Sequence, residues 1–414
     1  AHFQFVDGLS FEQVVELGKK FTENFPNNGP GWNLLALGYK NTGNVEKAIR
    51  IFKAMIKSAP KTAMYHSNLG NAYTAIGKIR QGITSFKQAL KLEPSAINAI
   101  EALGLAYLEI NKTGDAIECF KRVVKLDPNN RDSLYYLANI YLTDRNWEKA
   151  RRYLPKTSHR LSKSHHLECL LALEEKEEFF SKYQELSSEG VVDPLIGAVI
   201  AHGEQLFEVP INNTFCNNSL DHIYLGRIGS EDGFSDELAQ QLIDFHHSNK
   251  NDYRSQNLLK NGFQSSGNLF LLKEPFVPEL KLAIERQIER YRQNFQTSGQ
   301  GFLTLWPEKY SLFGWIVSIN SEGNLDAHMH KEGWLSGSFY LSLPETEAAS
   351  DDGKIAFSLC GPRYPAGDTV FEKKVLDIKQ RDICMFPSSI FHETIPFKGE
   401  KERISFAFDV IPHV

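Results

Sequence analysis

Small, aromatic and apolar residues recur with a fixed period through roughly the first 155 residues of the chain. Four prolines spaced 34 residues apart mark this period most clearly: Pro26, Pro60, Pro94 and Pro128. Three other positions repeat in register, one always leucine, the next small and a third always tyrosine: Leu35, Leu69, Leu103 and Leu137; Ala36, Gly70, Gly104 and Ala138; Tyr39, Tyr73, Tyr107 and Tyr141. Self-similarity at such a period indicates a stack of structural repeats.

Each repeat predicts a pair of short antiparallel helices. Small residues allow the two helices to cross closely, and larger residues such as Phe86 and Phe120 fill the space beside the crossing. A proline ends the second helix because it lacks an N–H and clashes with the preceding turn. One hairpin cannot bury its own apolar face, so the copies stack. We therefore expect an N-terminal α-solenoid over residues 1–155, and its pattern resembles tetratricopeptide repeats.

A stack of such hairpins presents a concave groove, which commonly holds peptides. Five polar or aromatic side chains are candidate liners of this groove, although they could equally well be solvated surface: Tyr39, Asn68, Asn71, Asn98 and Asn139. The expected partner of the repeats is a peptide or protein.

The hydrophobic pattern changes in two steps after the repeats. Over residues 156–214 the 34-residue register is lost, and we expect a helical connector or degenerate repeats. Two helical stretches follow, at 235–249 and 278–296, and then come short apolar or alternating runs bounded by turn residues: 312–320, 335–344, 354–359, 382–389 and 403–411. This order predicts a second domain at 215–414, with a buttress at 215–311 and a jelly roll at 312–414. The fold class expected for the whole chain is multidomain α + β.

Composition narrows the class of protein without identifying it. The chain has 414 residues, of which 42% are hydrophobic and 23% charged, as in globular proteins of two or three domains. The formal net charge of −5 argues against a broad nucleic-acid surface, and we expect no nucleic-acid partner. No apolar run is long enough to span a bilayer, and the first residues show no signal-peptide pattern.

The cysteines and histidines outside the jelly roll call for simple interpretations. Five scattered cysteines without a CxxC pair indicate free thiols in a reducing compartment, and a cytoplasmic location is expected. We expect the pair His246–His247, near the end of a helix, to be solvated. The pair His165–His166 is expected to lie in an irregular connector without a metal.

Three histidines within the predicted jelly roll are candidate metal ligands. His328 and His330 are two residues apart, and in an extended strand such residues project from the same face. Their imidazoles would then face the interior of the barrel and present nitrogens to one ion. His392, 64 residues further on, would supply a third imidazole from another part of the fold. A His-x-His pair alone is weak evidence for a metal site. The third histidine makes the interpretation stronger.

Arg403 and Ser405 form a second candidate constellation, 11 and 13 residues after His392. The two-residue spacing again places both side chains on one face of a strand. A buried guanidinium beside a metal site is costly unless a carboxylate pairs with it. An oxyacid co-substrate would supply that carboxylate through a bidentate contact.

These motifs resemble those of Fe(II)/2-oxoglutarate oxygenases. Their signature is His-x-(Asp/Glu), then a distant histidine, then Arg-x-Ser, and the matching segments here are AHMHKEGWLSGSFYLSLP (327–344) and ICMFPSSIFHETIPFKGEKERISFAF (383–408). The layout is also similar to the aspartyl/asparaginyl β-hydroxylases and collagen prolyl 4-hydroxylases, which carry tetratricopeptide modules. The resemblance covers residues 215–414 and is most specific over 315–408.

The resemblance implies a role for each matched residue. It makes His328 and His392 iron ligands, with no catalytic residue beyond the metal site. It makes Arg403 and Ser405 the pair that holds the distal carboxylate of 2-oxoglutarate. Tyr340 would reach the same carboxylate, and Ser336, four residues earlier on the same face, would contact the co-substrate through its hydroxyl.

The chain departs from the signature at His330, which occupies the position of the usual carboxylate ligand. We expect His330 to be a direct iron ligand. The alternatives are that His330 only supports a two-histidine site, or that Asp326 or Glu332 supplies an oxygen. A neutral imidazole would leave one more positive charge on the metal than a carboxylate, and imidazole suits Fe, Zn, Cu and Ni alike.

The function implied is that of a 2-oxoglutarate-dependent dioxygenase. It would use Fe(II), with 2-oxoglutarate and O2 as co-substrates, to hydroxylate a C–H bond, releasing succinate and CO2. A peptide or protein held by the repeat groove is the expected substrate, and no membrane partner is expected. Two alternatives stay open: a non-catalytic repeat scaffold with a degenerate oxygenase fold, and a three-histidine cupin-like dioxygenase that does not use 2-oxoglutarate. Trp315 and Phe386 are expected to belong to the core rather than to the wall of the site.

Overall fold

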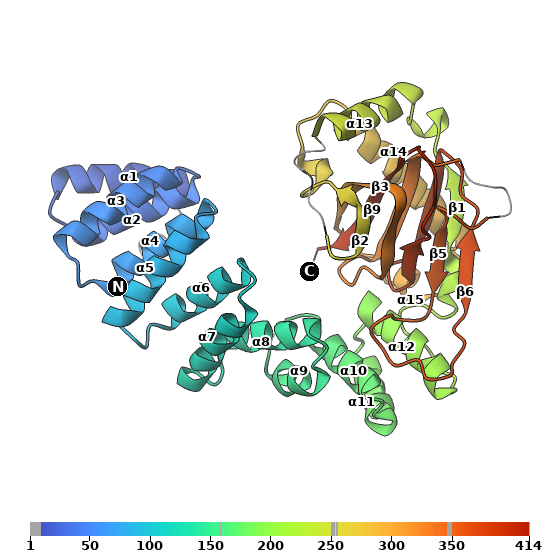
Figure 1. Ribbon diagram of the computed structural model, residues 1–414, viewed down its shortest axis with the longest axis horizontal. Helices are drawn as coiled ribbons and strands as arrows, with labels where there is room; N and C mark the ends of the chain where they lie inside the picture. The colour runs from blue at the N-terminus through green and yellow to red at the C-terminus, as the bar shows by residue number, and fades with distance from the viewer. Residues whose placement is uncertain (1–9, 158, 250–252, 254–255, 346–349, 414) are drawn as a thin grey trace. The chain divides into compact units, whose positions relative to one another are not determined.

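The computed structural model describes residues 10–157, 159–249, 253, 256–345 and 350–413 (Figure 1). The chain divides into two compact units, residues 1–162 and residues 163–414. The first is a helical solenoid and the second contains a curled antiparallel sheet, so the predicted multidomain α + β architecture is confirmed. In the described part of the chain, no helix has the length and apolar character needed to cross a membrane.

The first unit consists of helices joined by short turns, and its boundaries follow the 34-residue period. The helices are α1 (Phe11–Asn24), α2 (Gly29–Asn41), α3 (Val45–Ser58), α4 (Ala63–Ala75), α5 (Ile79–Leu92), α6 (Ile97–Leu108), α7 (Thr113–Leu126), α8 (Arg131–Thr143) and α9 (Trp147–Tyr153). Each hairpin pairs an even-numbered helix with the next one, from α2–α3 to α8–α9. Helix α1 precedes these hairpins and packs against α2.

Small residues at the helix crossings are required by the rings that face them. A Cβ atom on Gly70 would lie 2.5 Å from the ring of Phe86, and one on Gly104 would lie 2.9 Å from the ring of Phe120. Both phenylalanines are fully buried. In these two repeats the phenylalanine of the second helix therefore fills the space beside the glycine of the first helix.

Replacing Phe120 with alanine is expected to destabilise the solenoid strongly. Loss of a fully buried phenylalanine costs about 3–5 kcal/mol of unfolding free energy, since a cavity remains at the crossing. Calorimetry of the full chain would detect the earlier unfolding of the helical unit. Lys121→Ala, at the exposed neighbouring position, is the control, because its surface contact with Glu118 contributes at most about 1 kcal/mol. Equal shifts in the two variants would contradict this packing.

Several of the expected groove liners bind neighbours within the solenoid. Asn68 Nδ2 donates a hydrogen bond to Asn33 Oδ1 at 2.7 Å, which links α4 to α2. The ammonium of Lys47 lies 5.2 Å from the ring centroid of Tyr39. These contacts fix the side chains along the first helices of the repeats. Their role in lining a peptide groove stays a prediction.

The second unit begins with three helices from the segment expected to be a connector: α10 (Ser162–Ala172), α11 (Lys176–Ser188) and α12 (Pro194–Phe207). Every residue of α12 from Pro194 to Gly203 is buried. His165 lies inside α10, so the expected irregular conformation is wrong there. Its Nδ1 lies 2.7 Å from the buried Glu168 carboxylate, which explains its burial.

A curled antiparallel sheet of the jelly-roll type follows. Its strands are β1 (Tyr224–Arg227), β2 (Leu259–Gln264), β3 (Tyr310–His328), β4 (Leu335–Ser342), β5 (Ile355–Ser358), β6 (Lys373–Leu376), β7 (Asp382–Pro387), β8 (Phe391–Thr394) and β9 (Arg403–Pro412). Their order is β1-β7-β4-β9-β3-β8-β5-β6, and β2 also pairs with β3. The five predicted strands correspond to β3, β4, β5, β7 and β9. Because β1 and β2 lie within 215–311, that segment contributes strands as well as the expected helices.

The long strand β3 joins the two halves of the roll. Residues 310–319 of β3 pair with β9, whereas Leu325 and His328 pair with β8. The change of partner follows an irregularity at Glu322, whose φ is +62°. The backbone nevertheless continues as a strand through Gly323. A Cβ on Gly323 would lie 2.6 Å from the carbonyl oxygen of Lys260, so only glycine fits this close approach of β2.

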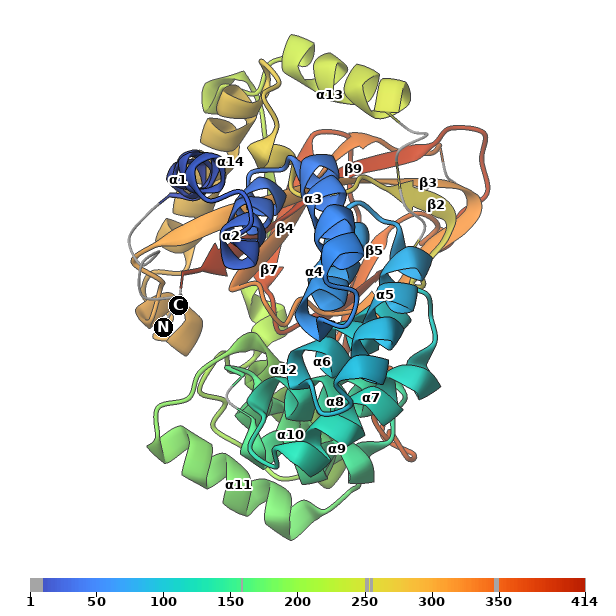
Figure 2. The ribbon, with the colours of Figure 1, turned by 90° about the vertical axis from the view of Figure 1, so that its left-hand side faces the viewer.

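Helices α13 (Asp236–Asn249) and α14 (Val277–Asn294) confirm the two helices predicted before the strands. The apolar face of α14, including Leu280 and Ile284, belongs to one core cluster with Phe339 of β4 and Phe406 of β9. In both views α12 and α13 lie at opposite ends of the sheet (Figures 1 and 2). The outer faces of β4 and β9 are thus covered by helix, and their inner faces are left to form a cavity.

The cysteines agree with the expectation of free thiols. No disulfide joins any of the five, and four of them are buried: Cys119, Cys169, Cys216 and Cys384. Burial raises the pKa of the Cys119 thiol to about 11, so it stays protonated and unreactive at neutral pH. The cytoplasmic location stays a prediction.

Candidate metal centre

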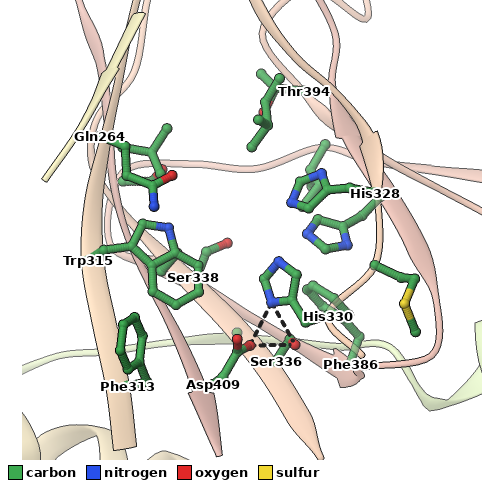
Figure 3. A pocket seen from close by; sticks show the side chains of 18 of the residues that line it. Gln264, Phe313, Trp315, His328, His330, Ser336, Ser338, Phe386, Thr394 and Asp409 are labelled. Atoms are coloured by element: carbon green, nitrogen blue, oxygen red, sulfur yellow. Dashed lines mark hydrogen bonds and ion pairs between the residues drawn. The ribbon is translucent and has the colours of Figure 1, made fainter. Parts of the chain in front are cut away.

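A cavity of about 640 Å3 lies inside the roll, and its walls come from β3, β4, β8 and β9. Inward-facing side chains of these strands alternate with outward-facing core residues, as the pleat of a strand requires. Figure 3 shows His328 and His330 facing Trp315 and Gln264 across the cavity. Every histidine and the arginine predicted from the sequence line this one space.

The structure brings His328, His330 and His392 together. His328 and His392 are directly opposite each other on β3 and β8, and their ring centroids are 4.4 Å apart. His330 follows the end of β3, and its ring centroid lies 5.1 Å from that of His328 and 5.0 Å from that of His392. One ligand nitrogen from each ring lies within 4.8 Å of the other two. The three imidazoles therefore present nitrogens to a common point.

Hydrogen bonds orient each ring by its Nδ1 atom. His328 Nδ1 lies 2.8 Å from the carbonyl oxygen of Asp326, and His392 Nδ1 lies 3.3 Å from that of Ile390. His330 Nδ1 lies 2.6 Å from Asp409 Oδ1. Because all three partners are acceptors, each Nδ1 is assigned the proton, which leaves each Nε2 with a lone pair.

Burial keeps His328 and His392 neutral. Desolvation, with the neighbouring His330 as a smaller cause, lowers the pKa of His328 to about 4. Desolvation and the two other imidazoles lower the pKa of His392 well below its usual range. Neutral imidazoles are the form that binds metal. The donor set of three unprotonated nitrogens in one cavity fits a divalent transition-metal ion.

The carboxylate of Asp326, which the sequence considered alone offers as an alternative oxygen donor, is hydrogen-bonded to other residues. Its Oδ1 accepts hydrogen bonds from Lys260 Nζ at 2.8 Å and from Asn324 Nδ2 at 2.7 Å. These contacts, with the Lys260 hydrogen bond as the largest cause, lower the pKa of its carboxyl. Only its main-chain carbonyl faces His328. Glu332 lines the cavity but is not part of the group of converging ligand atoms.

Asp409 is a functional residue that the sequence reasoning missed. It lies on β9, and its Oδ1 accepts hydrogen bonds from His330 Nδ1 at 2.6 Å and from Ser336 Oγ at 2.7 Å (Figure 3). A carboxylate that holds the far nitrogen of a metal-binding histidine fixes its tautomer and increases its basicity. The signal was present in the strand itself, because Arg403, Ser405 and Asp409 alternate along one face of β9.

Asp409→Asn is expected to weaken metal binding by about 10–100-fold. The substitution replaces the carboxylate that faces the His330 ring with a neutral amide, and the volume of the side chain stays nearly the same. The affinity for Fe(II) would be measured anaerobically by competition with a chelating dye. Asp382→Asn, at the β1–β7 pairing and not among the residues that line the cavity, is the control. An unchanged affinity in Asp409→Asn would show that His330 does not depend on this carboxylate.

Ser336 lies beside His330 rather than beside Arg403. Its hydroxyl contacts Asp409 Oδ1 at 2.7 Å, Ser388 Oγ at 2.7 Å and His330 Nδ1 at 3.2 Å. These bonds place it behind the candidate metal ligand. Its expected contact with the co-substrate stays a prediction.

Arg403 occupies the opposite part of the same cavity. Only 3% of the residue is exposed, and its Nε donates to the carbonyl oxygen of Gly353 at 3.0 Å. Its Nη1 lies 3.5 Å from Ser405 Oγ, and its guanidinium carbon lies 5.1 Å from the ring centroid of Tyr340. Desolvation lowers the pKa of Arg403, but arginine stays charged. Among the described residues no carboxylate pairs with this buried cation.

Tyr340 is fully buried behind Arg403. Its hydroxyl accepts a hydrogen bond from Ser338 Oγ at 3.2 Å, and burial raises the pKa of the phenol, so it stays protonated. Tyr340 and Ser405 are directly paired across β4 and β9. The sequence therefore grouped Arg403, Ser405 and Tyr340 correctly in space.

The remaining wall of the cavity is aromatic and polar. Trp315 is half-buried and lines the cavity, so the expectation that it belongs to the core rather than to the wall is wrong, whereas Phe386 is buried in a core cluster as expected and lines the cavity as well. Phe313 is 40% exposed, and Gln264 lies beside Trp315 (Figure 3). Apolar and polar residues alternate in the same way along a strand whose inner face lines a cavity and along one whose inner face packs in a core. The sequence alone therefore could not show that Trp315 lines a cavity.

Comparison with protein families agrees with both units. Residues 314–409 match the family described as "Putative 2OG-Fe(II) oxygenase". Residues 30–62 and 101–155 match tetratricopeptide-repeat models, and residues 70–111 match another model described as a TPR repeat. The fold and the site thus define a jelly-roll domain with a candidate metal centre. The chain is similar to tetratricopeptide-repeat families in its first unit and, over residues 314–409, to a 2OG-Fe(II) oxygenase family.

Solved structures similar to this chain include helical-repeat proteins. PilF of Pseudomonas aeruginosa is 17% identical and the match covers 43% of this chain and 90% of that one, with a TM-score of 0.36. A thermophilic TPR protein of Thermus thermophilus is 18% identical, covering 39% and 91%, with a TM-score of 0.34. MamA of Desulfovibrio magneticus is 20% identical, covering 36% and 83%, with a TM-score of 0.33. Comparison with curated proteins gives no significant match.

Proposed function

We propose that the C-terminal unit is an Fe(II)/2-oxoglutarate-dependent dioxygenase that hydroxylates a C–H bond of a peptide or protein. One observation carries the proposal: three histidines with converging ring nitrogens line the same cavity as a buried arginine that pairs with no carboxylate among the described residues. The family match over residues 314–409 agrees with it. His328, His330 and His392 would hold the iron.

Arg403 would bind the distal carboxylate of 2-oxoglutarate, with Ser405 and Tyr340 beside it. An Arg fork and a carboxylate form a charge-assisted pair, which offsets the cost of keeping the guanidinium out of water. Bound iron supplies the oxidising chemistry, in which 2-oxoglutarate, O2 and a substrate C–H bond give succinate, CO2 and an alcohol. The residues of the chain orient the co-substrate and the metal ligands and limit the access of water.

The tetratricopeptide repeats support a protein or peptide substrate, since such repeats typically mediate binding to peptides or proteins. In the cavity, Phe313, Trp315 and Gln264 offer an aromatic face and an amide to a substrate side chain. We propose that the repeats bind the protein or peptide substrate and that a side chain of this substrate is oxidised at the metal held by the three histidines.

The test is the formation of succinate from 2-oxoglutarate by the full chain. Metal-free protein is loaded with Fe(II) without oxygen and then exposed to O2, with and without a peptide library. The proposal predicts succinate that depends on both Fe(II) and 2-oxoglutarate, and a peptide that gains one oxygen atom. Oxygen uptake without 2-oxoglutarate would instead support a cupin-like dioxygenase. Absence of Fe(II) binding and of any turnover would support a non-catalytic scaffold.

A further inference from the structure

A second group of metal-binding side chains lies outside the cavity, where α13 meets the start of β9. It consists of His246, His247 and Glu402, and one ligand atom from each lies within 4.8 Å of the other two. None of the three lines the cavity of the candidate iron centre. We expected the histidine pair to be solvated, and this is wrong for His246, which is fully buried.

Among the residues that the structure describes, neither ring nitrogen of His246 has a hydrogen-bond partner. Buried polar groups in folded proteins are nearly always hydrogen-bonded, so an imidazole with two unsatisfied nitrogens requires an explanation. The hydroxyl of Tyr253 is also buried without a partner, and the two ring centroids are 5.3 Å apart. Two unsatisfied groups beside each other indicate that something binds between the helix and the sheet.

The spacing of the group suits a metal ion better than a hydrogen bond. His246 Nε2 lies 3.5 Å from Glu402 Oε1, which is longer than a good hydrogen bond. Two ligand atoms on a tetrahedral zinc ion, each bonded at roughly 2.0–2.1 Å, lie about 3.3 Å apart. The observed separation therefore needs little adjustment to become an edge of a zinc site.

The surroundings of Glu402 favour its role as a ligand. Its Oε1 accepts a short hydrogen bond from Ser318 Oγ on β3, which fixes the direction of the carboxylate. Groups that hold a ligand in this way are typical of metal sites. His247 is exposed, so the group is open to solvent on one side and an ion can enter.

We propose that His246, His247 and Glu402 form a second metal site, separate from the candidate iron centre, which binds a divalent ion of the zinc class. Two imidazoles and one carboxylate match the ligand preference of zinc, with water at the remaining position. Calcium and magnesium, in contrast, prefer oxygen ligands throughout. The ion would join α13 to the strand that carries Arg403, the residue immediately after Glu402.

The experiment counts zinc in the full chain after metal removal, with Zn2+ alone as the probe. The double variant His328→Ala/His392→Ala disables the candidate iron centre and leaves the second site unchanged. We expect this variant to keep one zinc ion per chain, measured by mass spectrometry after gel filtration. Adding His246→Gln or Glu402→Gln should remove that ion. His413→Gln, an exposed histidine bonded to Ser311 and remote from both groups in sequence, is the matched control and should keep it.

A thermal melt supplies a second readout that does not depend on the folding of the added variants. Zn2+ should raise the Tm of the His328→Ala/His392→Ala chain, because an ion that binds only the folded state stabilises it. The proposal is overturned if that chain binds no zinc and its Tm does not move. It is also overturned if its zinc survives both His246→Gln and Glu402→Gln. This result is independent of whether the enzyme uses 2-oxoglutarate.

Discussion

His392→Ala is expected to lower the affinity for Fe(II) by more than about 100-fold and to abolish turnover of 2-oxoglutarate. The ring is buried, neutral and placed directly opposite His328 on the paired strands β3 and β8. Losing a metal ligand should exceed the roughly 10–100-fold loss that follows when only a partner of a ligand is changed. Anaerobic titration with Fe(II) measures the affinity, and succinate formation measures the turnover.

The same titration on His328→Ala and His330→Ala tests the number of ligands. If all three imidazoles bind the ion, each alanine variant should show a loss of similar size. His222→Ala is a suitable control, because this buried histidine has no place in either group of metal-binding side chains. Normal Fe(II) affinity in His330→Ala would contradict a three-histidine centre and leave a site with two histidines.

Arg403→Gln is expected to weaken binding of 2-oxoglutarate severely while leaving Fe(II) binding in place. Removing one partner of a buried, hydrogen-bonded charge pair costs about 2–5 kcal/mol, which corresponds to roughly 30- to 3000-fold in Kd. The Kd is measured by titrating 2-oxoglutarate into the anaerobic Fe(II) protein. Arg403→Lys should recover little of the affinity, because an ammonium group cannot form the bidentate contact.

Arg403 also donates to the carbonyl of Gly353, so a structural effect must be separated from a binding effect. An Fe(II) affinity and a melting temperature close to those of the unmodified chain would establish that the cavity is intact. Unchanged affinity for 2-oxoglutarate in such a folded Arg403→Gln protein would show that the arginine serves another anion, such as the carboxylate of a substrate.

The repeat architecture was predictable because its signal is redundant. A small residue faces a large ring at the crossings of Gly70 with Phe86 and Gly104 with Phe120, and the same two positions hold a small and a large apolar residue in the other two repeats. A pattern repeated four times survives the loss of any one position. The helices after residue 162 have no such repetition, which explains why their membership of the second compact unit was not predicted.

The site was predictable where it depends on spacing within a strand, and was missed where it depends on tertiary contacts. His328, Arg403 and Ser405 follow from the two-residue period and from the family motif. The alternation along β9 could place Asp409 on the inner face, but its hydrogen bond with His330 joins residues 79 positions apart, so the strand alone could not identify this partner. The burial of His246 depends in the same way on a partner strand, so its helix alone suggested a solvated position.

The most direct measurement is an anaerobic crystal structure of the chain with Fe(II) and 2-oxoglutarate, with iron located by its anomalous scattering. The account predicts an iron peak between His328, His330 and His392, with the distal carboxylate of 2-oxoglutarate on Arg403. An iron peak only at His246, His247 and Glu402, or a 2-oxoglutarate molecule that does not contact Arg403, would contradict it.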